Sequence, residues 1–70
     1  MQTPEQILRV RQVSAQVGLA RTAIYDREAA GLFPRRVVIA RRADGRPKVV
    51  GWLQSEVQAW IAERAAERVA

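Results

Sequence analysis

The sequence predicts a mostly α-helical fold with one small β-hairpin, and its 70 residues suffice for a single domain over residues 1–70. Three observations lead to this prediction. Two short helical segments are joined by about three residues, β-branched residues then flank a tight turn, and an amphipathic helix follows. A helix pair joined in this way and followed by a hairpin makes a winged helix-turn-helix, which is the architecture that we expect.

The helix-turn-helix is expected over about residues 11–31. Gly18 ends its first helix, because glycine takes the left-handed conformation of a helix end without steric cost. The segment from Ala20 to Ala30 is rich in helix-forming residues, and Gly31 ends it in the same way. The second helix can therefore cross the first and present one face outward.

The start of the first helix has two interpretations. Thr3-Pro4-Glu5-Gln6 has the residues of a capped helix start, with a hydroxyl, a proline at the first position and a glutamine three residues on. Alternatively, Ile7-Leu8-Arg9-Val10 is a short extended segment and the helix begins near Arg11. The residues of this segment do not decide between the two.

A hairpin is expected over about residues 35–52. β-branched residues form two runs, and Asp44-Gly45 between them is typical of a tight turn. The strands should lie near 36–41 and 47–51. Pro47 has no backbone N–H to donate, so it should face a sheet edge or lie in the loop.

The last helix is expected over about residues 54–68. Ser55-Glu56-Val57-Gln58 fits the capping box of a helix start. An apolar stripe at helical spacing accompanies it, made of Leu53, Val57, Trp60 and Ile61. Such a stripe is far more often core than ligand platform, so Trp52 and Trp60 should pack against the helix-turn-helix.

Positive charge is concentrated in one segment of the chain. Twelve Lys and Arg residues stand against seven Asp and Glu residues, for a net charge of +5. Residues 35–48 hold this whole excess, since the remainder of the chain is balanced. The cations of the segment are Arg35, Arg36, Arg41, Arg42, Arg46 and Lys48, with Asp44 as its acid. A cationic patch suits a polyanion, and we expect these side chains, on the wing and its flanks, to contact DNA. The alternative is a solvated, arginine-rich hairpin that only keeps the protein soluble.

The residue types exclude several classes of site. The chain has no Cys and no His, so disulfides and ordinary zinc sites are excluded, and no metal site is expected. Nucleophilic catalysis lacks an imidazole base, so we expect no catalytic residues, no cofactor and no enzymatic activity. No apolar run approaches the ~20 residues of a membrane-spanning helix, and the N-terminus lacks the pattern of a signal peptide. We therefore expect a cytoplasmic protein with no membrane partner.

The second helix has the side chains of a DNA-reading helix near its start, where major-groove contacts are usually made. Ile24 should point inward, which leaves an outward cluster of Arg21, Thr22 and Tyr25. Arg21 can pair with both acceptors of a guanine, and Thr22 can contact a phosphate or a thymine methyl group. Tyr25 offers a hydroxyl and a flat face, while Asp26 can accept from a cytosine or hold Arg21. Double-stranded DNA is the expected partner, and an ordinary solvated helix face is the alternative.

A series of short motifs runs through the chain: Leu8-Arg9-Val10, Val13, Gly18-Leu19-Ala20-Arg21, Ile24-Tyr25, Gly31, Phe33-Pro34, Val50-Gly51-Trp52-Leu53, Ser55-Glu56-Val57 and Trp60-Ile61. In this order they resemble the AlpA-type phage regulators, over roughly residues 7–64. These regulators are small winged helix-turn-helix proteins, related in fold to excisionases and to MerR-type DNA-binding domains.

The resemblance implies a short extended segment before the first helix. It also implies a bacterial, nucleoid-associated transcriptional regulator that reads a specific DNA sequence, with the second helix in the major groove and the hairpin as wing. The family usually has a hydroxyl residue where Ala20 stands, so a helix cap worth about 1 kcal/mol is lost here. It often has a basic residue where Asp26 stands, and its hairpin is usually shorter and less rich in arginine.

Two other functions stay open. One is an architectural DNA-binding factor that bends DNA, in the manner of excisionases or small terminase subunits. The other is a protein-interaction module, whose spare apolar surface would be the Ala65-Ala66 and Val69-Ala70 end. One module of this size presents few base contacts, so we expect self-association on adjacent or inverted half-sites of the DNA.

Overall fold

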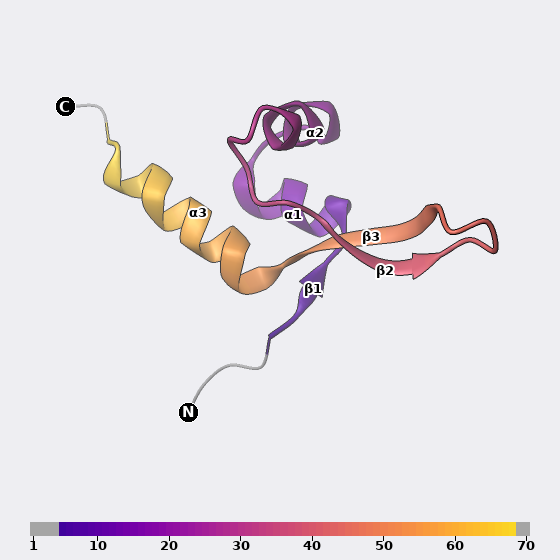
Figure 1. Ribbon diagram of the computed structural model, residues 1–70. Coiled ribbons are helices and arrows are strands. Elements are labelled where there is room, and N and C mark those ends of the chain that lie inside the picture. The colour runs from indigo at the N-terminus through magenta and orange to yellow at the C-terminus, as the bar shows by residue number, and fades with distance from the viewer. Residues whose placement is uncertain (1–4, 69–70) are drawn as a thin grey trace.

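The computed structural model describes residues 5–68, which form three helices and a three-stranded antiparallel sheet. The elements are β1 (Ile7–Leu8), α1 (Val10–Val17), α2 (Arg21–Ala29), β2 (Val37–Arg41), β3 (Pro47–Leu53) and α3 (Gln54–Ala66). The hairpin of β2 and β3 extends to one side and α3 to the other, with α1 and α2 between them (Figure 1). The molecule is accordingly elongated, at 51 × 34 × 19 Å.

The segment directly before the first helix is extended, as the resemblance to the AlpA-type regulators implies. β1 pairs with β3 in the register Ile7 to Leu53 and Leu8 to Trp52, so β3 is the central strand in the order β1-β3-β2. Helix α1 begins only at Val10. The alternative of a capped helix start is therefore wrong for the described part of that segment; its Thr3 and Pro4 lie outside the described residues.

Both predicted glycine stops of the helix-turn-helix are confirmed. Gly18 has a φ of 74° at the end of α1, and its N–H donates to the Ser14 carbonyl oxygen at 2.9 Å. The Ser14 hydroxyl donates to the Leu19 carbonyl oxygen at 2.7 Å, which closes the turn between the helices. Gly31 has a φ of 76° just after α2. Ala20 is the N-cap of α2 and has no side-chain capping bond, as the resemblance implies.

The core lies where the helix-turn-helix meets the central strand. Its buried residues are Leu8, Val13, Ile24, Phe33, Trp52 and Val57. Two tryptophans tie the segment after α2 to the core. Trp52 Nε1 donates to the Pro34 carbonyl oxygen and Trp60 Nε1 to the Leu32 carbonyl oxygen, both at 2.9 Å. The predicted anchoring role of both indoles is confirmed.

The hairpin matches its predicted strands and turn, except that β3 continues to Leu53. Gly45 has a φ of 88° at the tip, and the Arg42 N–H donates to the Arg46 carbonyl oxygen at 2.8 Å. Register shifts on both sides of Ala40 make the ladder irregular. Pro47 pairs with Arg41 at the start of β3, whereas the described β1 reaches only the far end of that strand. The expectation that Pro47 faces a sheet edge is therefore confirmed.

The predicted capping box at Ser55 is wrong. Strand β3 runs directly into α3, so Leu53 is the N-cap and Ser55 already lies in the first turn. The Ser55 N–H and hydroxyl both donate to the carboxylate of Glu5, fifty residues away in the chain. The helix ends at Ala66, slightly before the expected residue 68.

The exposed apolar surface differs from the expected one. Leu32 is 63% exposed, Ile7 46%, Ile39 44% and Val38 38%. Among the described residues, larger apolar side chains are thus exposed on the sheet and after α2 than the Ala65 and Ala66 of the helix terminus. Val69 and Ala70 lie outside the described residues.

Candidate nucleic-acid interface

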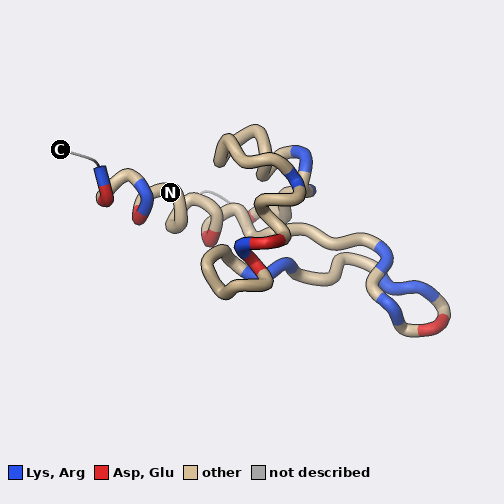
Figure 2. The backbone as a smooth tube through the Cα atoms, turned by 90° about the horizontal axis from the view of Figure 1, so that it is seen from above, with Lys and Arg blue, Asp and Glu red and all other residues tan. Residues whose placement is uncertain are grey.

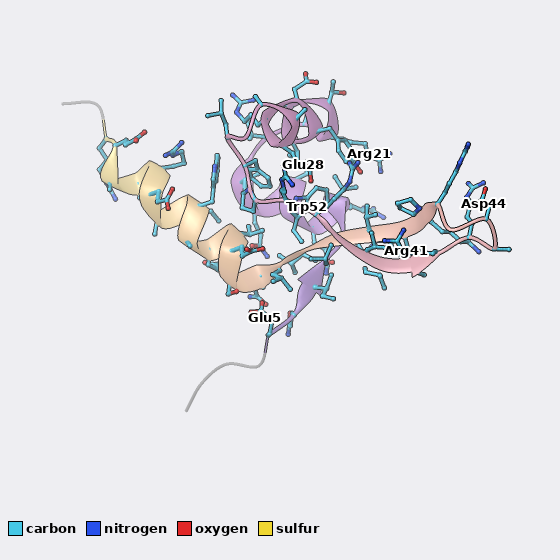
Figure 3. All side chains as sticks on the ribbon, viewed as in Figure 1. Glu5, Arg21, Glu28, Arg41, Asp44 and Trp52 are labelled. Atoms are coloured by element: carbon cyan, nitrogen blue, oxygen red, sulfur yellow. The ribbon has the colours of Figure 1, made fainter. Side chains whose placement is uncertain are left out.

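The first turn of α2 presents polar side chains to solvent. Arg21 and Thr22 are exposed, while Ile24 is completely buried and holds the opposite face of the helix against the core. In the view of Figure 3, Arg21 lies on the hairpin side of α2. Asp26 is exposed too, and in the described part of the chain no ion pair joins it to Arg21. The expectation that Asp26 holds Arg21 is therefore wrong in the described structure, and accepting from a cytosine is the other role expected for it.

Tyr25 is placed differently from the expectation. Its side chain is half-buried, and its ring centroid lies 5.8 Å from that of Trp52, with the planes inclined at 52°. The guanidinium carbon of Arg36 lies 5.2 Å from the Tyr25 centroid. The predicted outward orientation is wrong for the ring, because it packs against Trp52 of β3 at the edge of the core.

Glu28 and Arg36 form an ion pair between α2 and the segment that leads into the hairpin. The closest pair, Arg36 Nη1 and Glu28 Oε1, is 3.3 Å apart, and the Arg36 backbone N–H donates to Glu28 Oε2 at 2.7 Å. Only 13% of the Glu28 side chain is exposed. Sequence reasoning missed this role of Glu28, and the available signal was a carboxylate in the last turn of α2, eight residues before an arginine.

The tip of the hairpin carries most of the remaining predicted cations. Lys and Arg residues lie on both arms, with Asp44 at the turn (Figure 2). Arg42, Arg46 and Lys48 are exposed. Arg41 Nη1 donates to the Gly45 carbonyl oxygen at 2.8 Å, so this side chain braces the loop.

Asp44 shapes the turn more than it neutralises the tip. Its Oδ1 accepts the Arg46 N–H at 3.0 Å, whereas its ion pair with Arg46 Nε is 3.9 Å long. The Arg46 side chain is 83% exposed, and an exposed pair at this distance contributes little. Arg46 therefore stays available to an external anion, as does the exposed Arg35 at the base of the hairpin.

The far end of the molecule has a different electrostatic character. On α3, Arg64 lies 4.0 Å from Glu63 and 3.4 Å from Glu67, so cations and anions are interspersed there. In Figure 2 the two charges alternate along α3, whereas the hairpin tip is almost uniformly basic. The excess of cations over anions is thus found on the hairpin and its base, and not on α3.

Other kinds of site find no support in residues 5–68. No group of three or more His, Cys, Asp or Glu side chains there is placed to hold a metal ion. Within the same range, no helix is long and apolar enough to cross a membrane.

An exposed helix start beside a cationic hairpin, both mounted on one core, defines a small winged helix-turn-helix protein. The family model of the prophage CP4-57 regulatory protein (AlpA) matches residues 6–65, and the chain belongs to this family of phage regulatory proteins. It is 42% identical over 66 residues to the uncharacterized protein ORF88 of Enterobacteria phage P4, an alignment that covers 94% of this chain and 68% of that protein. No solved structure matches the chain. The family resemblance of the sequence motifs is thereby confirmed.

Proposed function

We propose that this protein is a sequence-specific DNA-binding regulator of phage or mobile-element transcription, without enzymatic activity. The observation that carries the proposal is the pairing of two surfaces on one core. These are the exposed first turn of α2 and the cationic hairpin, which we call the wing (residues 37–53). Membership of a phage regulatory family supports it. Within a bacterial cell such a protein would be associated with the DNA.

In this proposal α2 enters the major groove. Arg21 pairs with the two acceptors of a guanine, and Thr22 contacts a phosphate or a thymine methyl group. Asp26 is exposed and free to accept from a cytosine. Tyr25 has a smaller role in DNA contact, because its ring already packs on Trp52. Only its hydroxyl is assigned to the DNA.

The wing and its flanks supply the phosphate contacts or enter a narrow minor groove. Arg36 is engaged with Glu28, which leaves five cations for the nucleic acid: Arg35, Arg41, Arg42, Arg46 and Lys48. If all five contacted phosphates, the logarithm of the binding constant would fall with log salt at a slope of about −4.5. The braced Arg41 should contribute least, so a shallower slope is expected.

We further propose that two or more copies bind adjacent or inverted half-sites. One α2 start offers three side chains to the bases, and single modules of this size rarely achieve tight specific binding alone. Electrophoretic mobility on duplexes with one and two half-sites should show a second, cooperative complex only on the longer duplex.

Fluorescence anisotropy tests the proposal. The purified protein is titrated into a labelled duplex of its own upstream region and into a scrambled duplex, at low and near-physiological salt. We expect a preference for the upstream duplex that survives salt and is lost in Arg21→Ala. Arg68→Ala serves as the control, because it removes one positive charge from the far end of the molecule. No binding to either duplex would overturn the proposal.

Equal and salt-sensitive binding to both duplexes would favour an architectural factor instead. Its distinguishing property is bending of the DNA, which energy transfer between dyes at the two duplex ends measures in the same samples. A large bend without a change in promoter output would indicate that the protein is an architectural factor and not a transcriptional regulator.

A further inference from the structure

We infer that Glu28, Arg36 and Tyr25 form a positioning cluster that sets the angle between α2 and the wing. Glu28 and Arg36 then serve DNA binding without contacting DNA. The inference rests on the proposed function, because the angle matters only if α2 and the wing engage the same ligand.

The ion pair of the cluster fixes direction as well as distance. Glu28 is in the last turn of α2, and Arg36 immediately precedes β2. One carboxylate oxygen accepts the backbone N–H of Arg36 at 2.7 Å, and the other faces its guanidinium at 3.3 Å. Two contacts to one residue restrain both the position and the orientation of the strand entry. Because the Glu28 side chain is only 13% exposed, water competes poorly for it.

Aromatic packing completes the link to the second strand of the wing. Arg36 lies over one face of Tyr25, and the Tyr25 ring contacts Trp52 of β3. Trp52 in turn donates to the Pro34 carbonyl oxygen, two residues before Arg36. The contacts therefore form a closed path from α2 through the strand entry and β3. In the view of Figure 3, the labels of Glu28 and Trp52 both fall between α2 and the sheet.

The inner end of β3 is held in the core, where Trp52 of β3 and Ile24 of α2 are both completely buried. In the described residues β2 packs mainly against β3, so the contacts of Glu28 with Arg36 are what join the entry of β2 directly to α2. The outer part of the wing extends into solvent, where its residues from Ile39 to Lys48 are all exposed. A small rotation at the base of such an arm displaces its tip by several ångströms, so the base is where a positioning contact has most effect.

Because Glu28 is negatively charged, a positioning role and a purely electrostatic role predict opposite changes in DNA affinity when it is replaced. A carboxylate near DNA lowers affinity by repulsion, so its removal should strengthen binding if charge were its only effect. A positioning role predicts the opposite for the specific site. Arg36 offers a parallel contrast. A phosphate contact tolerates Lys, whereas an ammonium group replaces only in part a guanidinium that lies over the Tyr25 ring and faces the Glu28 carboxylate.

The test compares Glu28→Gln, Arg36→Lys and the control Glu63→Gln with the unaltered protein on the upstream and scrambled duplexes. Glu63→Gln removes the same charge from exposed α3. We expect Glu28→Gln and Arg36→Lys to lose about tenfold or more in affinity for the upstream duplex, while scrambled binding stays equal or becomes tighter. Equal or tighter binding of Glu28→Gln to the upstream duplex would overturn the inference, as would full affinity in Arg36→Lys.

A second measurement works without DNA. Residual dipolar couplings of backbone amides report the orientation of α2 relative to the wing in the free protein. One common alignment is expected for the unaltered protein and for Glu63→Gln, and an altered or averaged wing orientation for the other two variants. An unchanged wing orientation in these two variants would overturn the inference, whatever the result with DNA. If the unaltered protein did not prefer the upstream duplex, that separate result would refute the proposed function. Arg36→Lys keeps the test available if Glu28→Gln does not fold.

Discussion

The carboxylate of Glu5 accepts two hydrogen bonds from Ser55, one from the backbone N–H at 3.0 Å and one from the hydroxyl at 2.6 Å. The neighbouring Gln54 N–H donates to the Gln6 carbonyl oxygen at 2.8 Å. The segment before β1 thus satisfies N–H groups at the start of α3 that the Leu53 N-cap leaves without partners. A carboxylate there also interacts favourably with the helix dipole. Glu5 therefore joins the first described residues to the last helix.

This arrangement predicts a pH-dependent part of the stability. The Ser55 hydroxyl, followed by the Ser55 N–H, lowers the pKa of Glu5 below its ordinary value. A lowered folded-state pKa means that the contribution is present above the ordinary glutamate pKa of about 4.3 and is lost as the pH falls through the folded value. Glu5→Gln should therefore melt at a lower temperature than the unaltered protein at neutral pH. Thermal unfolding across a pH series should show this difference shrinking in acid, and a difference that is independent of pH would contradict the assignment.

Gly51 is predicted to be required for the pairing of β1 with β3. A Cβ at this position would lie 2.6 Å from Ile7 Cγ2 and 2.7 Å from the Leu8 carbonyl oxygen. The side chain can rotate away, but the carbonyl oxygen belongs to the backbone of β1 and can move only with the strand. Gly51→Ala should thus cost about 1–3 kcal/mol in urea unfolding. Increased stability, which the same exchange gives where a methyl group fits, would contradict the close approach.

The N-cap of α2 is predicted to be improvable. Ala20 has the extended backbone of an N-cap, with φ −67° and ψ 157°, but no side-chain oxygen to accept from the first turn. Ala20→Ser should raise the free energy of unfolding by about 1 kcal/mol. Ala62→Ser is the control, since it places the same side chain on the exposed middle of α3 and should lower stability by a few tenths of a kcal/mol. Equal effects of both changes would show that Ala20 is not a limiting cap.

The wing is predicted to supply much of the salt-dependent binding. Replacing Arg42, Arg46 and Lys48 by Gln should weaken DNA binding and make the salt slope shallower by up to about 2.7. Arg41 is kept in this variant, because it braces the turn through the Gly45 carbonyl oxygen. A variant with Arg64→Gln and Arg68→Gln on the far end should leave the slope nearly unchanged. If the two variants altered the slope equally, general charge rather than the wing would explain the binding.

Local signals in the sequence were sufficient for the ends of the helices and for the turn of the hairpin. Gly18, Gly31 and Gly45 all have positive φ, and each was expected at a turn for that reason. The burial of Ile24 and Val57 likewise follows from their places on the inner faces of single helices. These features depend on neighbours in the chain, so a single sequence contains the information.

Features that depend on distant segments were missed. The pairing of β1 with β3 involves two residues on each strand, too few for a recognisable strand pattern. The capping of α3 depends on Glu5, and the half-buried position of Tyr25 depends on Trp52 of β3. The candidate site shows the same division, since Arg21 and Thr22 are exposed as expected while the pairing of Arg36 with Glu28 was not foreseen.

The central claim is that α2 and the wing bind DNA together, and an NMR titration tests it most directly. Isotopically labelled protein is titrated with the duplex of its own upstream region, and backbone amide shifts are followed residue by residue. The account predicts that the largest changes fall in residues 21–26 and 41–48, with little change in residues 60–66 of α3. Binding accompanied by changes concentrated in α3 or in the segment 31–34, with α2 and the wing unaffected, would contradict it.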